Sequence, residues 1–345
     1  MVGGRANGRT RIVAAGKTDT GRQRRHNEDH VLVKSDLDLF VVADGMGGHN
    51  AGDVASALTT TSLHNFFEAT RTAPVPGPPP EDEVPLPPAA RRLVAAIRKA
   101  NRDVFEISST MQQHHGMGST VVAAHVARNA AQIHIGHVGD SRCYRIRGEG
   151  IELLTRDHSL VNDALAIKPD LSEDELARLP RNIITRALGM KDAVKVDLRT
   201  EDLHPGDVFL LCSDGLSGMV GDDQILEVFG ITDDLDEICE LLIAMANDAG
   251  GNDNVTAVVI RVVEAVVREA SIPDLAVAAE EVAVPVLDGI VNPETLDLMH
   301  AGAEVDVAEA PRQRFEVAVA RCRRCDHEII VGNMFCVECG AAVGR

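Results

Sequence analysis

The sequence predicts an α+β fold in which antiparallel sheets carry helices on their outer faces. Short runs rich in Val, Ile, Ala and Leu recur along the first 263 residues, and Gly, Asp or Asn bounds them, as is typical of strands. Two long helical patterns separate the early strand runs from the later ones, so strands and helices do not alternate as in a βαβ fold. The 345-residue chain is 45% hydrophobic, which is sufficient for one large core and an accessory piece.

The individual elements follow from local spacing. Apolar residues one or two turns apart predict helices over residues 52–68 and 89–110, and a third helix spans about 234–247. Residues 160–188 are expected to form a helical insert between two strands, with a helix start at Ser172. The nine expected strands cover residues 11–15, 30–34, 39–43, 119–126, 132–138, 142–147, 194–198, 207–212 and 255–262.

Composition divides the chain into three parts. Residues 9–263 are expected to form one continuous catalytic-type domain, interrupted at 72–88 by a proline-rich surface loop that cannot continue a helix. Residues 264–320 hold twelve acidic residues against three basic ones without a clear hydrophobic period, which is typical of a linker. The last part, residues 321–345, contains two closely spaced cysteine pairs.

Charge and composition argue against several classes of ligand. The formal net charge is −19 and only 3% of the residues are aromatic, which disfavours nucleic acid and anionic membrane as primary ligands. No apolar run approaches the roughly 20 residues that span a bilayer, and no apolar signal core follows the amino terminus. We therefore expect a cytoplasmic protein, in which the isolated Cys143, Cys212 and Cys239 are reduced core residues.

Acidic residues beside small or turn-forming residues mark four distant places in the chain. Each adjoins an apolar run, and Asp140, between two strand runs, is a further candidate of the same kind. A lone Asp-Gly is by default a turn. Several buried carboxylates without cations would repel one another and raise their pKa values, so the set favours a metal site over unrelated turns. The four segments are Asn27-Glu28-Asp29, Asp44-Gly45-Met46-Gly47-Gly48-His49, Ser213-Asp214-Gly215 and Asn252-Asp253-Asn254.

Gathered carboxylates at strand ends suit hard divalent cations, which take oxygen ligands and often keep several waters. Two such ions about 3.5–4 Å apart can share an activated water and hold both ends of an in-line phosphoryl displacement. The sequence therefore predicts a two-metal centre for phosphoryl chemistry. In the turn after Asp44, Gly45 would let its carbonyl approach a cation, and the following glycines leave room above the ion.

Eight motifs, in order over about 250 residues, resemble those of a known family. The chain is similar to the bacterial branch of the metal-dependent serine/threonine protein phosphatases of the PPM (type 2C) family. The matching stretches are Arg24-Arg25-His26-Asn27-Glu28-Asp29, Val42–His49, Gly118-Ser119-Thr120, Gly136–Arg142, Thr155-Arg156-Asp157-His158-Ser159, Ile184-Thr185-Arg186-Ala187-Leu188-Gly189, Cys212–Leu216 and Asp253-Asn254-Val255-Thr256.

The resemblance implies a fold and a set of residue roles. The fold would be a sandwich of two antiparallel sheets flanked by helices, in α-β-β-α layers, with two Mg²⁺ or Mn²⁺ ions at one end. Arg24 would bind the substrate phosphate, and residues 160–188 would be a flap beside the active site that contacts the substrate protein. Asp44 would bridge both ions, and the carbonyl of Gly45 would bind one of them. Asp214 and Asp253 would complete the coordination of one ion, and Glu28 and Asp29 would bind the other directly or through its waters. Asp140 would bind a third metal ion more weakly.

The mechanism implied is hydrolysis of phosphoserine and phosphothreonine in proteins by a hydroxide that bridges the two ions, without a phosphoenzyme. Met46 stands where animal relatives have a histidine that protonates the leaving oxygen. The general acid therefore stays open between His49, His158 and a metal-bound water. Arg22 and Arg25 are expected to be solvated.

The cysteine pairs near the carboxy terminus predict a structural zinc site. Two C-x2-C pairs supply four thiolates with no open position, and residues 328–335 between them are expected to form a short hairpin. So small a segment cannot bury a core, so the ion would provide most of its folding free energy. We expect this zinc ribbon to bind a protein partner or to mediate self-association. Its ligands are Cys322, Cys325, Cys336 and Cys339.

The leading function is thus a protein phosphatase whose substrates are phosphoproteins, among them a bacterial serine/threonine kinase and its targets. The alternative is a pseudophosphatase or phosphoprotein-binding scaffold whose zinc ribbon carries the function. Intact Arg24, Asp44, Asp214 and Asp253 argue against that alternative. A small-molecule phosphatase is a third candidate.

Overall fold

The computed structural model describes residues 9–48, 51–72, 86–172, 175–176, 178–180 and 183–265, together with the backbone of 319–321 and 328–330. The chain divides into two compact units, residues 1–267 and 268–345. Within the described residues, no helix is both long enough and apolar enough to pass through a lipid bilayer.

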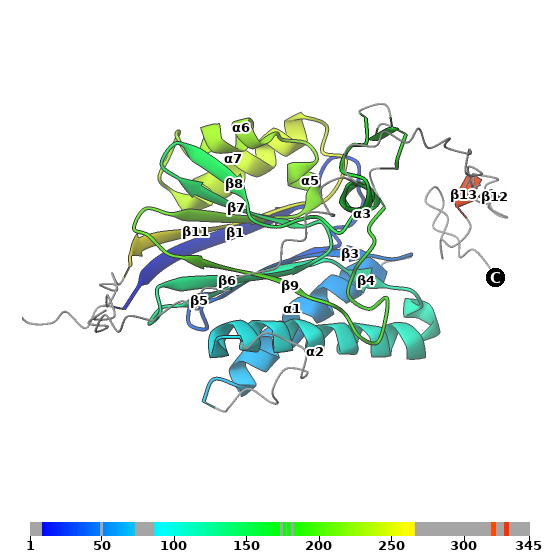
Figure 1. Ribbon diagram of the computed structural model, residues 1–345, viewed down its shortest axis with the longest axis horizontal. Coiled ribbons are helices and arrows are strands. Elements are labelled where there is room, and N and C mark those ends of the chain that lie inside the picture. Colours follow the sequence, from blue (N-terminus) through cyan, green and yellow to red (C-terminus); the bar gives the residue numbers. More distant parts are fainter. Residues whose placement is uncertain are drawn as a thin grey trace, which may run out of the picture. The chain divides into compact units, whose positions relative to one another are not determined.

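Two antiparallel sheets form the centre of the first unit (Figure 1). The first sheet has the strand order β1 (Arg11–Asp19), β11 (Val255–Glu264), β10 (Val208–Cys212), β7 (Arg142–Arg147) and β8 (Gly150–Leu153). The second has the order β2 (Asp29–Lys34), β3 (Leu39–Met46), β5 (Val121–Ala127), β6 (Gln132–Val138) and β9 (Asp197–Asp202), and the short β4 (Gly118–Ser119) pairs with β3.

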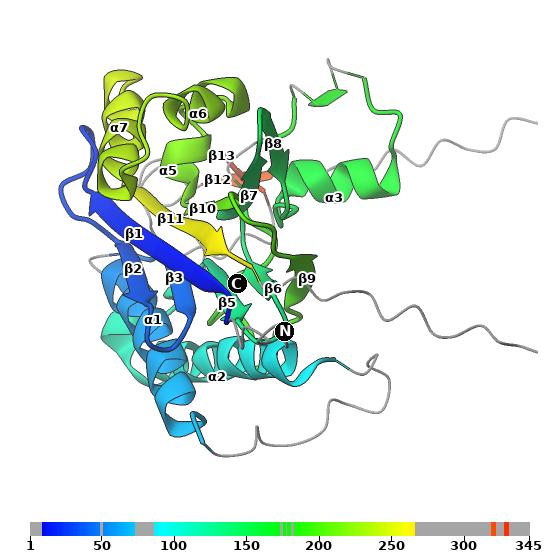
Figure 2. The same cartoon turned by 90° about the vertical axis from the view of Figure 1, so that its left-hand side faces the viewer.

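Helices cover the outer faces of both sheets. On the second sheet lie α1 (Ala51–Ala69) and α2 (Pro88–Thr110), and on the first lie α6 (Asp222–Val228) and α7 (Leu235–Asp248). Three short pieces complete the described helices: α5 (Asp214–Ser217), a 3-10 turn at Gln112–His114, and α3 (Leu160–Ile167), which lies beside β7 and β8 (Figure 2). These α-β-β-α layers confirm the predicted fold class.

Three apolar layers hold the sandwich together. Between the sheets, Phe40 and Val42 face Phe209 and Leu211, and all four side chains are fully buried. One outer layer packs α1 and α2 on the second sheet, and the other packs α6 and α7 on the first. Because β3 is buried on both faces, its residues 39–43 read as an unbroken apolar run rather than an alternating one.

Most predicted elements agree with the structure to within a few residues. The edge strand β9 begins at Asp197 rather than at Val194, and β8, α5, α6 and the 3-10 turn were not predicted. In the insert 160–188, helix α3 ends at Ile167 and begins after Ser159, whose side chain accepts from the Asn162 N–H. The predicted helix start at Ser172 agrees with its contacts, since Ser172 Oγ accepts from the Glu175 N–H at 3.3 Å and Glu175 Oε2 accepts from the Ser172 N–H at 2.9 Å. Most of the proline-rich loop (73–85) and of the linker (266–318) lies outside the described residues.

In the second unit, β12 (Val319–Arg321) pairs antiparallel with β13 (Glu328–Ile330). The first residues of the predicted hairpin over 328–335 thus pair with a strand that precedes the first cysteine pair, and the rest of that hairpin lies outside the described residues. All four predicted zinc ligands lie outside the described residues.

Candidate metal centre and active site

The antiparallel sheets bring distant acidic residues to one end of the sandwich. Asp29 at the start of β2 lies opposite Asp44 near the end of β3. In the other sheet, Cys212 at the end of β10 pairs with Ala257 near the start of β11, so Asp214 and Asp253 adjoin the same end. Asp140 lies there too, in the turn between β6 and β7.

Asp44 is held through its backbone by Thr120. The Asp44 N–H donates to Thr120 Oγ1 at 3.1 Å, and the Thr120 N–H donates to the Asp44 carbonyl at 2.8 Å. Thr120 Oγ1 also lies 2.7 Å from Ser141 Oγ, and both hydroxyls are buried. This pair of hydroxyls therefore connects the strand that carries Asp44 with the turn that carries Asp140.

Asp29 is the most buried of the acids, with 3% of its surface exposed. Its Oδ2 accepts hydrogen bonds from Ser213 Oγ at 2.7 Å and Thr256 Oγ1 at 2.6 Å, and both donors belong to the opposite sheet. Its Oδ1 is buried and has no partner in the described structure. Burial, more than these hydrogen bonds can offset, raises the pKa of Asp29 from 3.8 to about 7.

Three neighbouring acids, Asp44, Asp214 and Asp140, show the same electrostatic strain. Burial first, and then Asp29 and Asp214, raise the pKa of Asp44 well above its usual range. Burial and the neighbouring Asp253 raise the pKa of Asp214, and burial with Asp214 raises that of Asp140 to about 7. One carboxylate oxygen of Asp140 and one of Asp214 are buried without a partner among the described residues. Crowded, unsatisfied carboxylate oxygens are suited to hard divalent cations, so the residues present fit the predicted ions.

Glycines let Glu28 and the end of β3 approach each other. A Cβ on Gly45 would lie 2.0 Å from the Gly52 carbonyl oxygen, and one on Gly52 would lie 2.8 Å from the Glu28 carboxyl group. The Gly45 N–H donates to the Glu28 carbonyl at 3.0 Å, and the Glu28 N–H donates to Asn254 Oδ1 at 2.8 Å. Burial raises the pKa of Glu28, although Arg24 opposes that change.

Arg24 lies at the solvent side of the acidic cluster. Its Nη2 donates to Asp253 Oδ2 at 2.7 Å, while 48% of its side chain is exposed. An exposed guanidinium beside the carboxylates can reach an anionic group that enters from solvent. Arg22 and Arg25 are also exposed, as expected.

Comparison with known proteins establishes the family. The family model described as protein phosphatase 2C matches residues 19–257. The chain belongs to this family. The phosphatase is 36% identical over 247 residues to the serine/threonine phosphatase stp of Listeria monocytogenes, a match that covers 71% of this chain and 93% of the relative.

Solved structures agree. The serine/threonine phosphatase PstP/Ppp of Mycobacterium tuberculosis is 33% identical, with a TM-score of 0.62 and coverage of 73% of this chain and 99% of that one. The catalytic domain of PstP in complex with two manganese ions is likewise 33% identical, with a TM-score of 0.61 over the same shares. The protein is a metal-dependent serine/threonine protein phosphatase.

Of the two histidines considered as the general acid, only His158 lies within the described residues. His49 lies outside the described residues. His158 is 5% exposed, and both ring nitrogens already have contacts: Nδ1 accepts from the Gly139 N–H at 3.0 Å, and Nε2 lies 3.2 Å from Asp197 Oδ2. His158 therefore has no free nitrogen with which to protonate a leaving group in the phosphatase.

Sequence reasoning gave no role to the polar residues that support the acids. Each of these residues stands next to a predicted acid or within one of the family's motifs. A hydroxyl or amide side chain beside a predicted metal ligand was therefore the only sequence feature that could have pointed to them. Their partners became visible only in the folded phosphatase. These residues are Thr120, Ser141, Ser213, Asn254 and Thr256.

Proposed function

We propose that the phosphatase removes phosphate from phosphoserine and phosphothreonine in proteins with two Mg²⁺ or Mn²⁺ ions held at the acidic end of the sandwich. Asp44 would contact both ions, since acids from both sheets lie around it: Asp29 is its partner across the β2–β3 pair, and Asp214 adjoins the same end of the sandwich. The carbonyl of Gly45 and the carboxylates of Glu28, Asp29, Asp214 and Asp253 would complete the set, and Asp140 would hold a third, weaker ion. The observation that carries this assignment is the convergence, at one end of the sandwich, of buried carboxylate oxygens that have no partner in the part of the chain that the structure describes.

When bound, the ions would offset the charge of the substrate dianion and lower the pKa of a shared water to give hydroxide. Arg24 would bind two oxygens of the phosphate with its planar guanidinium and orient the phosphorus for in-line attack. Its present partner, Asp253, shows that the guanidinium reaches the cluster. Thr120 and Asn254 would keep the backbones of Asp44 and Glu28 in place during the reaction.

We further propose that Cys322, Cys325, Cys336 and Cys339 bind one structural Zn²⁺, and that this ribbon is an interaction module for a protein partner or for self-association. The proposal rests on the spacing of the four cysteines. The substrates would be a serine/threonine kinase and its targets, and the site of action would be the cytoplasm.

Hydrolysis of phosphoserine and phosphothreonine peptides with Mn²⁺, in the presence and absence of a chelator, tests the function. The full-length protein should release phosphate only with the metal, and Asp44→Asn or Asp253→Ala should lower kcat by at least about a thousandfold, since the set of metal ligands would be broken. A manganese-loaded parent chain that binds phosphopeptides without hydrolysing them would indicate a scaffold. Hydrolysis of small phosphate esters alone would indicate a small-molecule phosphatase.

A further inference from the structure

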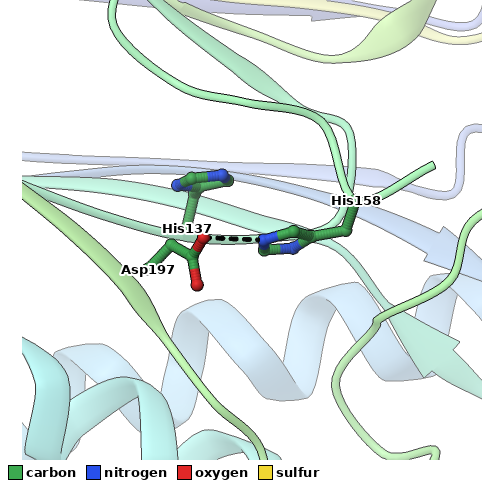
Figure 3. Close-up of side chains that lie close together, drawn as sticks. All are labelled: His137, His158 and Asp197. Atoms are coloured by element: carbon green, nitrogen blue, oxygen red, sulfur yellow. Dashed lines mark ion pairs between the residues drawn. The ribbon is translucent and has the colours of Figure 1, made fainter. Parts of the chain in front are cut away.

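A buried group of side chains lies next to the turn that carries Asp140, and Figure 3 shows three of its members. His137 on β6 and His158 stack with ring centroids 4.8 Å apart and planes 9° apart, and both are nearly inaccessible to solvent. Asp197 at the start of β9 lies beside them, and Arg186 donates to its Oδ1 at 2.7 Å. We call His137, His158, Arg186 and Asp197 the His158 network.

The contact with Gly139 assigns the proton of His158. The Gly139 N–H donates to Nδ1 at 3.0 Å, so Nδ1 carries no hydrogen and the neutral ring is protonated on Nε2. Nε2 lies 3.2 Å from Asp197 Oδ2 and can donate to it (Figure 3). Arg186 Nη1 lies 2.8 Å from Nε2 but can itself only donate, so it is a close neighbour of this N–H and not its hydrogen-bond partner. Burial lowers the pKa of His158, which is consistent with a neutral ring.

Two imidazoles and a carboxylate within 4.8 Å of one another are also a common metal-binding set. Here the space next to His158 Nε2 is taken by the Arg186 guanidinium, whose Nη1 lies 2.8 Å away. His137 Nε2 lies 2.9 Å from the Arg156 carbonyl, to which it donates. The positive charge that a cation would supply is thus already present as Arg186, so the contacts favour a role in positioning over metal binding.

Three separate segments meet at His158. It is bound to Gly139 in both directions, because its own N–H donates to the Gly139 carbonyl at 2.9 Å while its ring accepts from the Gly139 N–H. Its carbonyl accepts from the Thr185 N–H at 2.8 Å. Next to it, Ser159 forms a β-bridge with Ile184, so the two ends of the insert 160–188 are joined here.

Gly139 restricts which backbone conformations and which side chains this turn can accept. Its φ is +112°, which few residues other than glycine adopt, and a Cβ there would lie 2.6 Å from Thr120 Cβ. The turn is therefore confined between Thr120, which supports Asp44, and His158, which directly precedes the insert and accepts from Thr185 at its carboxyl end. A shift of His158 would be transmitted to Asp140, the next residue in the chain.

We propose that His158 is a positioning residue with two separable functions: Nδ1 fixes the Gly139–Asp140 turn at the metal centre, and Nε2, through Asp197 and Arg186, fixes the carboxyl end of the insert beside the active site. The proposal rests on the proposed function, because it assigns the first function to catalysis and the second to the binding of substrate protein.

Two substitutions separate these functions. In His158→Asn, the amide oxygen can take the place of Nδ1 and accept from Gly139, but the side chain no longer reaches Asp197. In His158→Gln, the longer amide can donate to Asp197, but the Gly139 N–H loses its acceptor. His134→Gln is the control, since His134 is a buried histidine on β6 that, like His158, has a contact to β9, here a hydrogen bond with Thr200.

Hydrogen exchange of the Gly139 N–H, measured by NMR on [¹⁵N]glycine-labelled protein, tests the first function without reference to activity. Exchange should be at least about tenfold faster in His158→Gln and unchanged in His158→Asn and His134→Gln, because only His158→Gln leaves this donor without a partner. Equal exchange in both His158 variants would overturn the proposal. This arm remains decisive even if the parent chain hydrolyses no phosphopeptide, a result that would refute the proposed function alone.

Kinetics test the second function. In His158→Asn, KM for a phosphopeptide should rise about fivefold while kcat and KM for an aryl phosphate stay near those of the parent; in His158→Gln, kcat for both substrates should fall about tenfold. Asp197→Asn should reproduce the His158→Asn pattern, which keeps the test available if one His158 variant fails to fold. Equal losses on both substrates in all these variants would show a merely structural role and would refute the proposal.

Discussion

Replacement of Asp29 by asparagine should stabilise the metal-free phosphatase. Asp29 is 3% exposed, and its pKa is raised from 3.8 to about 7 in the folded chain. The unfolded chain releases this proton at much lower pH, so above pH 7 the ionised Asp29 opposes folding. The interval between 3.8 and about 7 corresponds to about 4 kcal/mol, which is an upper value for the gain from Asp29→Asn at pH 8.5.

The gain should depend on pH in a defined direction. As the pH falls through about 7, the folded protein takes up the proton on Asp29, and the cost that the substitution removes becomes smaller. At pH 5 the expected gain is about 2 kcal/mol, because the unfolded chain is still ionised there. Since 1 kcal/mol moves Tm by about 2–4 °C for a domain of this size, Asp29→Asn should raise Tm by up to about 8–16 °C at pH 8.5 and by about half as much at pH 5.

The assay is thermal unfolding of chelator-treated protein, parent and variant, at the two pH values. Asp207→Asn is the control, because Asp207 is equally buried but bound by Arg147 at 2.6 and 2.8 Å, so its replacement should lower Tm. With Mn²⁺ the order should reverse, since the variant would lose a metal ligand. A lower Tm for metal-free Asp29→Asn at pH 8.5, or the same gain at both pH values, would refute the crowding of carboxylates described above.

Three further predictions concern other parts of the molecule. Arg24→Lys should raise KM for phosphopeptides about tenfold, because one ammonium group cannot replace the planar guanidinium; an unchanged KM would remove Arg24 from phosphate binding. Gly215→Ala should lower both Tm and the affinity for Mn²⁺, because a Cβ at this position would lie 2.0 Å from the Asn254 carbonyl oxygen. Wild-type values of both quantities would contradict this close approach of the two backbones. Cys322→Ser should remove the one Zn²⁺ per chain measured by elemental analysis and leave aryl phosphate hydrolysis within about twofold of the parent; retained zinc would exclude the four-cysteine site.

The central strands were predicted well because burial on both faces gives each of them a continuous apolar run that is visible in the local sequence. Residues 39–43 and 208–212 are apolar throughout, since both faces of these strands are buried. The strand β9 was misplaced because it is an edge strand and carries charges: Arg199 pairs with Glu201 on β9 itself and with Glu152 on β8 of the other sheet. The apolar residues just before it, Val194 and Val196, attracted the prediction instead.

The acids of the site could be found because each stands in a short motif beside an apolar run. The residues that hold these acids in place could not be found from the sequence, because they do so through contacts between the two sheets. Nothing in the local sequence shows that Ser213 and Thr256 both donate to Asp29, or that Thr120 lies under the positive-φ turn at Gly139. The general acid stays unassigned for the same reason: sequence proximity suggested His158, whereas its contacts give both nitrogens other partners.

The order of the strands in the two sheets has a consequence for biosynthesis. The acidic end draws on β2 and β3 from one sheet and on β10 and β11 from the other, and β11 is also the strand that pairs with β1. A nascent chain that has emerged only as far as β10 therefore leaves β1 without its neighbour and lacks Asp253. With the proposed ligands, the ions would bind only after nearly the whole domain has left the ribosome, so premature termination should yield inert protein rather than a partly working hydrolase.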